Sequence, residues 1–76
     1  MSRKKHYTSI EFQTRLKACM DDSGLSGIEV AKKVGCNRKA IYGYYYGDYC
    51  PDAVTFMRLC KLFKKSAEYM WGWVNE

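Results

Sequence analysis

Cysteine and histidine are the residues of this sequence best suited to metal binding or nucleophilic catalysis. The four cysteines lie at positions 19, 36, 50 and 60 without any Cys-x-x-Cys pair, and the only histidine is His6. A structural zinc site needs four Cys or His ligands in paired short spacings, and a catalytic cysteine needs a histidine base. We therefore expect no metal, no cofactor and no enzymatic activity, and most of the cysteines are expected to be small buried hydrophobic residues.

A second group of chemically capable side chains lies between residues 37 and 46, where asparagine, arginine, lysine and tyrosine supply hydrogen-bonding groups and flat rings. If this stretch is a helix with Ile41 and Tyr44 pointing inward, positions 38, 39, 42, 43 and 46 share the opposite face. Arg38 on that face can donate two hydrogen bonds to O6 and N7 of a guanine in the major groove of DNA. The alternatives are a solvated charged face for Arg38 and Lys39, and packing or a partner surface for the tyrosines.

The positive charge of the chain is concentrated in its first half. Residues 1–40 hold nine Lys or Arg and four Asp or Glu, whereas residues 41–76 hold four of each. The whole net charge of +5 therefore belongs to the first half. Such one-sided charge favours an anionic partner, either nucleic acid or an acidic surface.

Length and hydropathy restrict the class of protein further. Seventy-six residues with 47% hydrophobic and 28% charged side chains suit one small globular domain. No apolar run approaches the roughly 18 residues that span a bilayer, which excludes a membrane-spanning helix. Charged residues follow the basic start of the chain, where a secretory signal peptide would be apolar, so secretion is not expected. We therefore expect a cytoplasmic protein with a disordered basic arm at 1–7, a single domain at 8–76, and neither a membrane nor a small-molecule partner.

Capping signals predict five short helices and no sheet. Thr8 with Glu11 and Ser26 with Glu29 have the spacing of capping boxes, and single N-caps follow at positions 37, 52 and 66. The expected helices run from 9 to about 22, 27–34, 38–46, 53–63 and 67–71, and glycines at 24, 35 and 47 end the first three. Their apolar stripes predict a core that includes Ile10, Phe12, Leu16, Cys19, Met20, Ile28, Val30, Ala31, Val34, Ala53, Phe56, Leu59, Cys60 and Phe63.

The connection between the second and third of these helices has the geometry of a helix-turn-helix. It is short and contains a glycine, as this motif requires. Ala31 would let the two helices approach closely, Gly35 would make the left-handed turn, and Ile41 would anchor the third helix in the core.

Over about residues 9–72 the chain resembles the phage-repressor and Cro-like helix-turn-helix family, the xenobiotic-response-element type of bacterial regulators. The segments that carry the resemblance are Phe12…Arg15-Leu16-Lys17, the run from Gly24 to Arg38, Ile41…Tyr44…Gly47, Pro51-Asp52, Leu59-Cys60-Lys61-Leu62-Phe63 and the run from Ser66 to Gly72. The resemblance implies an all-α, compact bundle of five short helices of the lambda-repressor type, with the helix-turn-helix at about 27–46.

The resemblance also implies that the third helix enters the major groove of double-stranded DNA. The base contacts implied are Asn37, Arg38, Lys39, Tyr42, Gly43 and Tyr46. The phosphate contacts expected are Ser26, Gly27, Lys32 and Lys33, together with Arg3, Lys4 and Lys5 of the arm.

Two residues depart from the pattern of the family. Gly27 stands where the family often has a Gln that holds a phosphate and braces the reading helix. Gly43 lies inside the reading helix, where glycine costs about 1 kcal/mol relative to alanine. Gly43 either allows the backbone to approach DNA closely or indicates that this face no longer reads bases.

The C-terminal segment from Tyr69 to Val74 contains three aromatic residues and predicts a homodimer interface. Its expected interface residues are Tyr69, Met70, Trp71, Trp73 and Val74. The alternative is that Tyr69 and Trp71 complete the core of the monomer.

Together these observations predict a transcriptional regulator that binds double-stranded DNA in a sequence-specific way. The expected protein is a small repressor or Cro-like protein of bacterial or phage origin, and it would occupy an operator as a homodimer. One alternative is a helix-turn-helix protein-interaction module, antitoxin-like or a regulator-binding partner, without base readout. The run of aromatic residues from Tyr42 to Tyr46 favours that alternative. Another is single-stranded nucleic acid binding, in which the tyrosines would stack on bases.

Overall fold

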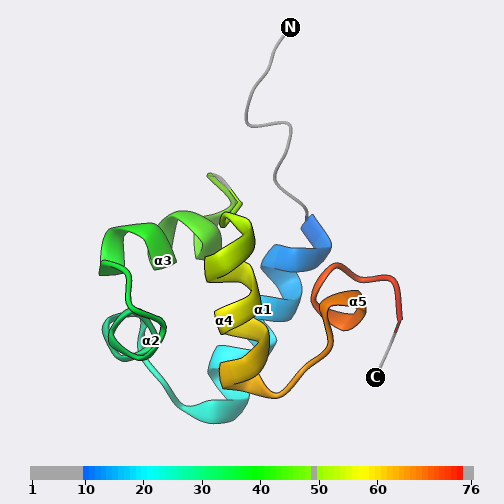
Figure 1. The fold of residues 1–76 in the computed structure, drawn as a ribbon, viewed down its shortest axis with the longest axis horizontal. Helices are drawn as coiled ribbons and strands as arrows, with labels where there is room; N and C mark the ends of the chain where they lie inside the picture. Colours follow the sequence, from blue (N-terminus) through cyan, green and yellow to red (C-terminus); the bar gives the residue numbers. More distant parts are fainter. Residues whose placement is uncertain (1–9, 49, 75–76) are drawn as a thin grey trace, which may run out of the picture.

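The computed structural model describes residues 10–48 and 50–74, and five helices pack around one core within them (Figure 1). The helices are α1 (Ile10–Ser23), α2 (Gly27–Val34), α3 (Arg38–Tyr46), α4 (Ala53–Phe63) and α5 (Ala67–Met70). In Figure 1, α1 and α4 occupy the middle of the molecule, with α2 and α3 on one side and α5 on the other. The described residues contain no strand, which confirms the prediction of an all-α bundle of five short helices.

Helices α2 to α5 begin where capping residues predict them to begin. Ser26 and Glu29 form the capping box of α2: Oγ of Ser26 accepts from the Glu29 amide at 3.2 Å, and Oε1 of Glu29 accepts from the Ser26 amide at 2.8 Å. The N-caps of the later helices are Asn37, Asp52 and Ser66, and each side chain accepts a hydrogen bond from the amide three residues on. The predicted cap Thr8 and the predicted arm at 1–7 lie outside the described residues.

Every helix contributes a completely buried side chain to the core. These side chains are Phe12 and Leu16 of α1, Val30 of α2, Ile41 of α3, Leu59 of α4 and Met70 of α5. A cluster of rings adds to them: the centroid of Trp71 lies 5.6 Å from that of Phe12 and 5.0 Å from that of Phe56. The core therefore joins α1, α4 and the end of α5 through aromatic packing.

Three residues predicted for the core are exposed. Ile10 is the first residue of α1, and Ala53 is the first residue of α4, so neither lies beneath a neighbouring helix. Ile28 is exposed because the inner face of α2 is formed by positions 27, 30, 31 and 34. That spacing turns position 28 about 100° away from the core.

The cysteines are divided between two environments. Cys19 and Cys60 are buried, Cys36 and Cys50 are half-buried, and no disulfide joins these four residues. Burial raises the pKa of the Cys19, Cys36 and Cys60 thiols, so these groups stay protonated at neutral pH. The expectation that most of the cysteines are small buried hydrophobic residues thus holds fully for two of them. Within the described ranges, no group of three or more His, Cys, Asp or Glu is arranged to hold a metal ion.

Candidate nucleic-acid interface

The turn between α2 and α3 fixes the geometry of the candidate interface. Gly35 has φ +80° and donates its amide to the carbonyl of Ala31 at 2.9 Å, and the next amide, of Cys36, reaches the same carbonyl at 3.0 Å. A side chain at position 35 would be strained because L-residues rarely adopt this conformation. Ala31 is buried where the two helices meet, and Ile41 is fully buried. The structure therefore confirms the roles predicted for all three positions.

Arg58 of α4 holds the end of α2. Its Nη1 donates to the carbonyl of Val34 at 3.1 Å, which places a cation at the C-terminus of α2, where the helix dipole favours positive charge. The sequence did not indicate this role, because the two residues are 24 positions apart and Arg58 looks like an ordinary exposed residue of an amphipathic helix.

Gln13 of α1 contacts the C-terminal end of the motif. Its Nε2 donates to the carbonyl of Tyr45 at 3.0 Å, near the C-terminus of α3. The ammonium of Lys17 lies 5.1 Å from the centroid of the Tyr45 ring. α1 therefore contacts the C-terminal end of α3 through two side chains that the sequence did not indicate, again because the partners are distant in sequence.

The outward face of α3 is an open hollow of about 500 Å³. Five of the six predicted base-contact residues line it together with Asp48: Arg38, Lys39, Tyr42, Gly43 and Tyr46. Arg38 and Lys39 are exposed, Tyr46 is 65% exposed, and Gly43 is buried at the wall of the hollow. Asn37 does not line it, because its Oδ1 caps α3 by accepting from the Ala40 amide at 2.8 Å.

The ring of Tyr42 is packed between α2 and Tyr46. It is stacked on the ring of Tyr46, with centroids 6.3 Å apart and planes 22° from parallel. On its other side it lies against Gly27: a Cβ built there would be 2.5 Å from Cζ and 2.8 Å from Oη of Tyr42. The hydroxyl of Tyr42 is thus held beside the N-terminus of α2.

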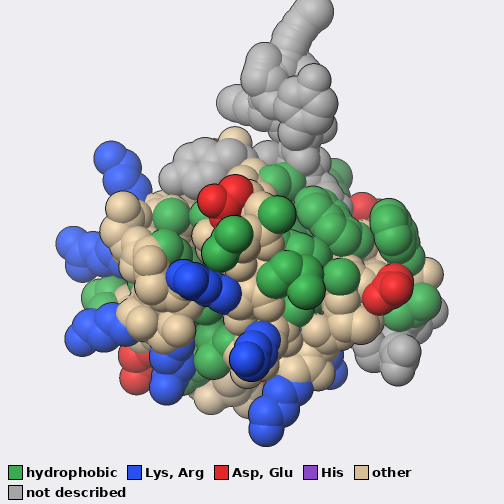
Figure 2. Space-filling view, in the orientation of Figure 1, with side chains coloured by type: hydrophobic (Ala, Val, Ile, Leu, Met, Phe, Trp, Pro, Cys, Tyr) green, Lys and Arg blue, Asp and Glu red, His purple; other side chains and the backbone are tan. Residues whose placement is uncertain are grey.

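The predicted phosphate-binding lysines lie beside the same motif. Lys32 and Lys33 are exposed in the last turn of α2 and line a hollow of about 360 Å³ with Gly35, Arg58 and Lys61. Figure 2 shows lysine and arginine side chains gathered over the side of the molecule that contains α2 and α3 and continuing below α4. Ser26 is exposed, and Gly27 is buried under Tyr42. Arg3, Lys4 and Lys5 lie outside the described residues.

Comparison with protein families gives a match that contains α2, α3 and the turn between them. The sequence model of a family described as helix-turn-helix matches residues 16–70, from the middle of α1 to the end of α5. The chain belongs to the Cro/C1-type helix-turn-helix family. This finding confirms the resemblance to phage repressors and Cro-like proteins, and it makes the chain a DNA-binding helix-turn-helix regulator in a family that is not typically enzymatic. No individual curated protein matches the sequence.

The C-terminal segment of this helix-turn-helix protein differs from the predicted dimer surface. Met70 is fully buried and belongs to the core, so its prediction as an interface residue is corrected. Trp71 is half-buried against Phe12 and Phe56, as in the alternative in which the segment completes the monomer.

Tyr69 is also engaged within the monomer. The guanidinium of Arg15 lies 4.4 Å from the centroid of its ring, and the ammonium of Lys65 lies 4.9 Å from it. Trp73, which is 76% exposed, and Val74 remain on the surface of this helix-turn-helix protein. No helix in the described ranges has both the length and the apolar character that crossing a membrane requires.

Proposed function

We propose that this chain is a sequence-specific repressor or Cro-like regulator that occupies an operator with α3 in the major groove of double-stranded DNA. The observation that supports this proposal is the hollow on α3. Two cationic side chains and two tyrosines meet there, while Ile41 and Tyr44 fix the opposite face of the helix in the core. Major-groove recognition needs such a set of exposed donors on a rigidly held helix.

The side chains of α3 have separate roles in the proposal. Arg38 donates two hydrogen bonds to O6 and N7 of a guanine, and Lys39 contacts a neighbouring base or phosphate. Tyr46 offers its ring to thymine methyl groups, and the hydroxyl of Tyr42 reaches a phosphate beside α2. Gly43 lets the backbone approach the bases. Asn37 contributes only through its Nδ2, because its Oδ1 accepts the capping hydrogen bond at the start of α3. Recognition of adenine through two hydrogen bonds needs both side-chain atoms, so it is excluded for Asn37 as long as Asn37 caps the helix.

Phosphate contacts come from α2. The amides of Gly27 and Ile28 precede the first intrahelical hydrogen bond of α2, which runs from Val30 to the carbonyl of Ser26. They point along the positive end of the helix dipole and suit a phosphate oxygen. Ser26, Lys32 and Lys33 add to this site, and Arg3, Lys4 and Lys5 are proposed to follow the adjacent backbone or minor groove.

We further infer that the regulator binds as a homodimer in the cytoplasm of a bacterial host, as a phage-encoded or chromosomal protein. Helix-turn-helix dimers read two half-sites about one helical turn apart. The exposed Trp73 and Val74, with the outer edges of Tyr69 and Trp71, supply the apolar surface for this contact.

Selection from a randomised duplex pool, repeated at about 50 and 200 mM salt, tests the proposal. The expected result is a palindromic motif whose affinity falls steeply as the salt concentration rises. Weak binding without a motif would refute base readout and would favour the protein-interaction alternative. Competition with single strands separates the duplex from a single-stranded target.

A further inference from the structure

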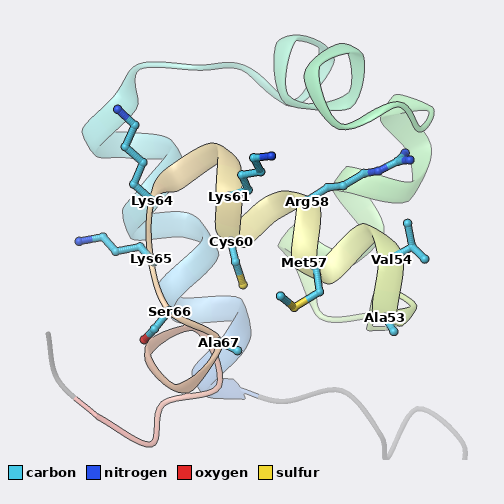
Figure 3. Close-up of a pocket in the computed structure, with 10 residues that line it drawn as sticks. All are labelled: Ala53, Val54, Met57, Arg58, Cys60, Lys61, Lys64, Lys65, Ser66 and Ala67. Carbon is cyan, nitrogen blue, oxygen red and sulfur yellow. The ribbon is translucent and has the colours of Figure 1, made fainter.

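Another hollow lies on the outer side of α4, and the function proposed for α3 does not use it. It is an open groove of about 800 Å³ between α4 and the start of α5 (Figure 3). Val54 and Met57 line it and are 59% and 56% exposed, although both are large apolar side chains. In Figure 3, the sulfur atoms of Met57 and Cys60 lie between the two helices, on the same side as Ala67. We call this surface the α4 groove.

The charge around the α4 groove has one sign. Arg58, Lys61, Lys64 and Lys65 line its edges, and none of the described residues that line it is acidic. Val54, Met57 and Lys61 are spaced by three and four positions, so they form one stripe along α4, and Lys64 follows at the C-cap of the helix. The lining is therefore apolar toward the start of α4 and cationic toward its end.

This pattern identifies the chemistry of an occupant. An exposed apolar patch with a charged edge is typical of a protein-binding surface. A second copy of this chain paired through the same face would bring the two cationic edges together, and the chain carries a net charge of +5. The sugar-phosphate backbone of DNA would leave Val54 and Met57 facing charged oxygens, so a duplex does not fit the apolar half.

We propose that the α4 groove binds an acidic amphipathic helix of a partner protein. The apolar side chains of that helix cover Val54 and Met57, and its carboxylates pair with Lys61 and Lys64. Helices that dock in grooves are recognised in this way, through anchors at i, i+3, i+4 and i+7. The regulator would thereby contact a second protein through α4 while α3 faces DNA.

The test is a titration of the isotope-labelled full chain with a synthetic helical peptide that has leucines on one face and glutamates beside them. Two control peptides carry the same leucines with lysines in place of the glutamates, or the same composition in scrambled order. Backbone amide shifts locate the binding site, and calorimetry gives the affinity. We expect saturable shifts between Ala53 and Ala67 with the acidic peptide only.

Matched variants separate the two halves of the α4 groove. Met57→Lys and Lys61→Glu should each weaken binding of the acidic peptide at least about tenfold, the loss typical of a central interface residue. Ile10→Lys likewise replaces an exposed apolar side chain with lysine, but outside the groove, and should leave binding unchanged. Lys61→Glu should also gain affinity for the lysine-containing peptide. Circular dichroism and duplex binding confirm that Met57→Lys is folded.

Four results would overturn the proposal. The first is the absence of saturable shifts at peptide concentrations up to about 1 mM, which corresponds to a binding free energy of about −4 kcal/mol. The second is equal binding of the acidic and lysine-containing peptides. The third is a shift of groove residues with protein concentration alone, which identifies a second copy as the occupant. The fourth is a shift of the same residues with duplex DNA alone, which assigns the surface to DNA.

Discussion

The ring of Tyr42 occupies the space directly above the α-carbon of Gly27, where any Cβ would come within 2.5 Å of the ring. The glutamine that the family often carries at this position is therefore absent for a physical reason. Gly27 and Tyr42 act as a pair, in which the small residue on α2 leaves room for the end of the Tyr42 ring on α3. The hydroxyl of Tyr42 then takes a place beside the start of α2, where the glutamine side chain would otherwise contact a phosphate.

We predict that Gly27→Ala weakens duplex binding by about 1 kcal/mol or more while the midpoint of chemical unfolding changes little. The ring end of Tyr42 must move away from the new methyl group, and the gain of up to about 1 kcal/mol of helix propensity for alanine over glycine offsets this cost. The measured quantities are the affinity for the selected duplex and the urea midpoint.

The control for this prediction is a double-mutant cycle with Tyr42→Ala. Once the ring is gone, Gly27→Ala and even Gly27→Gln should be tolerated, and Gly27→Gln should recover part of the affinity. Equal losses from Gly27→Ala with and without the ring would contradict the pairing, because the effect would then arise from the α2 backbone.

Arg58→Gln is predicted to destabilise the protein by about 1 kcal/mol, since a cation and a hydrogen bond at the end of α2 are lost on an exposed surface. The measurement is urea unfolding followed by circular dichroism, with an unchanged slope. Lys61→Gln removes the same charge one turn further along α4, and no hydrogen bond to Val34 is lost with it. If both variants lower the free energy of unfolding by the same amount, the hydrogen bond from Arg58 to Val34 contributes nothing beyond the change in net charge.

Lys64→Gly is predicted to stabilise the protein by about 0.5–1 kcal/mol. Lys64 ends α4 with φ +58°, the only non-glycine residue with positive φ in the described ranges, and glycine adopts this conformation without a steric cost. Lys61→Gly, within the helix, should instead destabilise by about 1 kcal/mol. The two thermal midpoints should therefore move in opposite directions, and a fall for Lys64→Gly would contradict the prediction.

Features that depend on neighbouring residues could be predicted from the sequence. The bounds of α3 agree with prediction because Asn37 and Gly47 are local signals, and the capping box at Ser26 is complete within four residues. Ile28 was misassigned because it was chosen for its apolar side chain, although the face formed by positions 30, 31 and 34 places position 27, and not 28, toward the core. Gly27 has no side chain to indicate burial, and the ring that covers it belongs to Tyr42, fifteen positions further along the chain.

Features that depend on the arrangement of helices could not be predicted in this way. Gln13 contacts the C-terminal end of α3 and Arg58 contacts the C-terminal end of α2, through hydrogen bonds between residues 32 and 24 positions apart in sequence. Met70 and Trp71 looked like surface residues because a short aromatic segment has no periodicity that marks an inner face. The α4 groove depends on where α5 returns to α4, which no local pattern specifies.

The stability of the protein is predicted to fall in acid partly through the helix caps. Backbone hydrogen bonds lower the pKa of Asp52 and of Glu29 in the folded protein. Each group therefore contributes stability that is fully present above its ordinary pKa of about 4 and is lost as the pH falls through the lowered value. Asp52→Asn keeps a capping oxygen but does not ionise, so it should flatten the acid limb of the pH–stability curve. Asp21→Asn makes the same change on α1 and serves as the control. Identical acid limbs for Asp52→Asn and the wild-type chain would contradict the prediction.

Base readout and phosphate contact are predicted to respond differently to mutation. Arg38→Ala should cost about 1–3 kcal/mol on the selected duplex and relax the preference at one base pair of each half-site. Lys32→Ala should weaken binding to all duplexes alike and reduce the slope of log K against log salt by about 1 per protomer.

The control variant Lys64→Ala removes one charge from the α4–α5 connection and should change neither the affinity nor the salt slope. Because α3 is held by Gln13 at one end and by the turn at the other, these losses should appear without a change in the unfolding midpoint. If Arg38→Ala lowered affinity for every sequence equally, Arg38 would be a phosphate contact and the readout would have to come from Lys39 and the tyrosines.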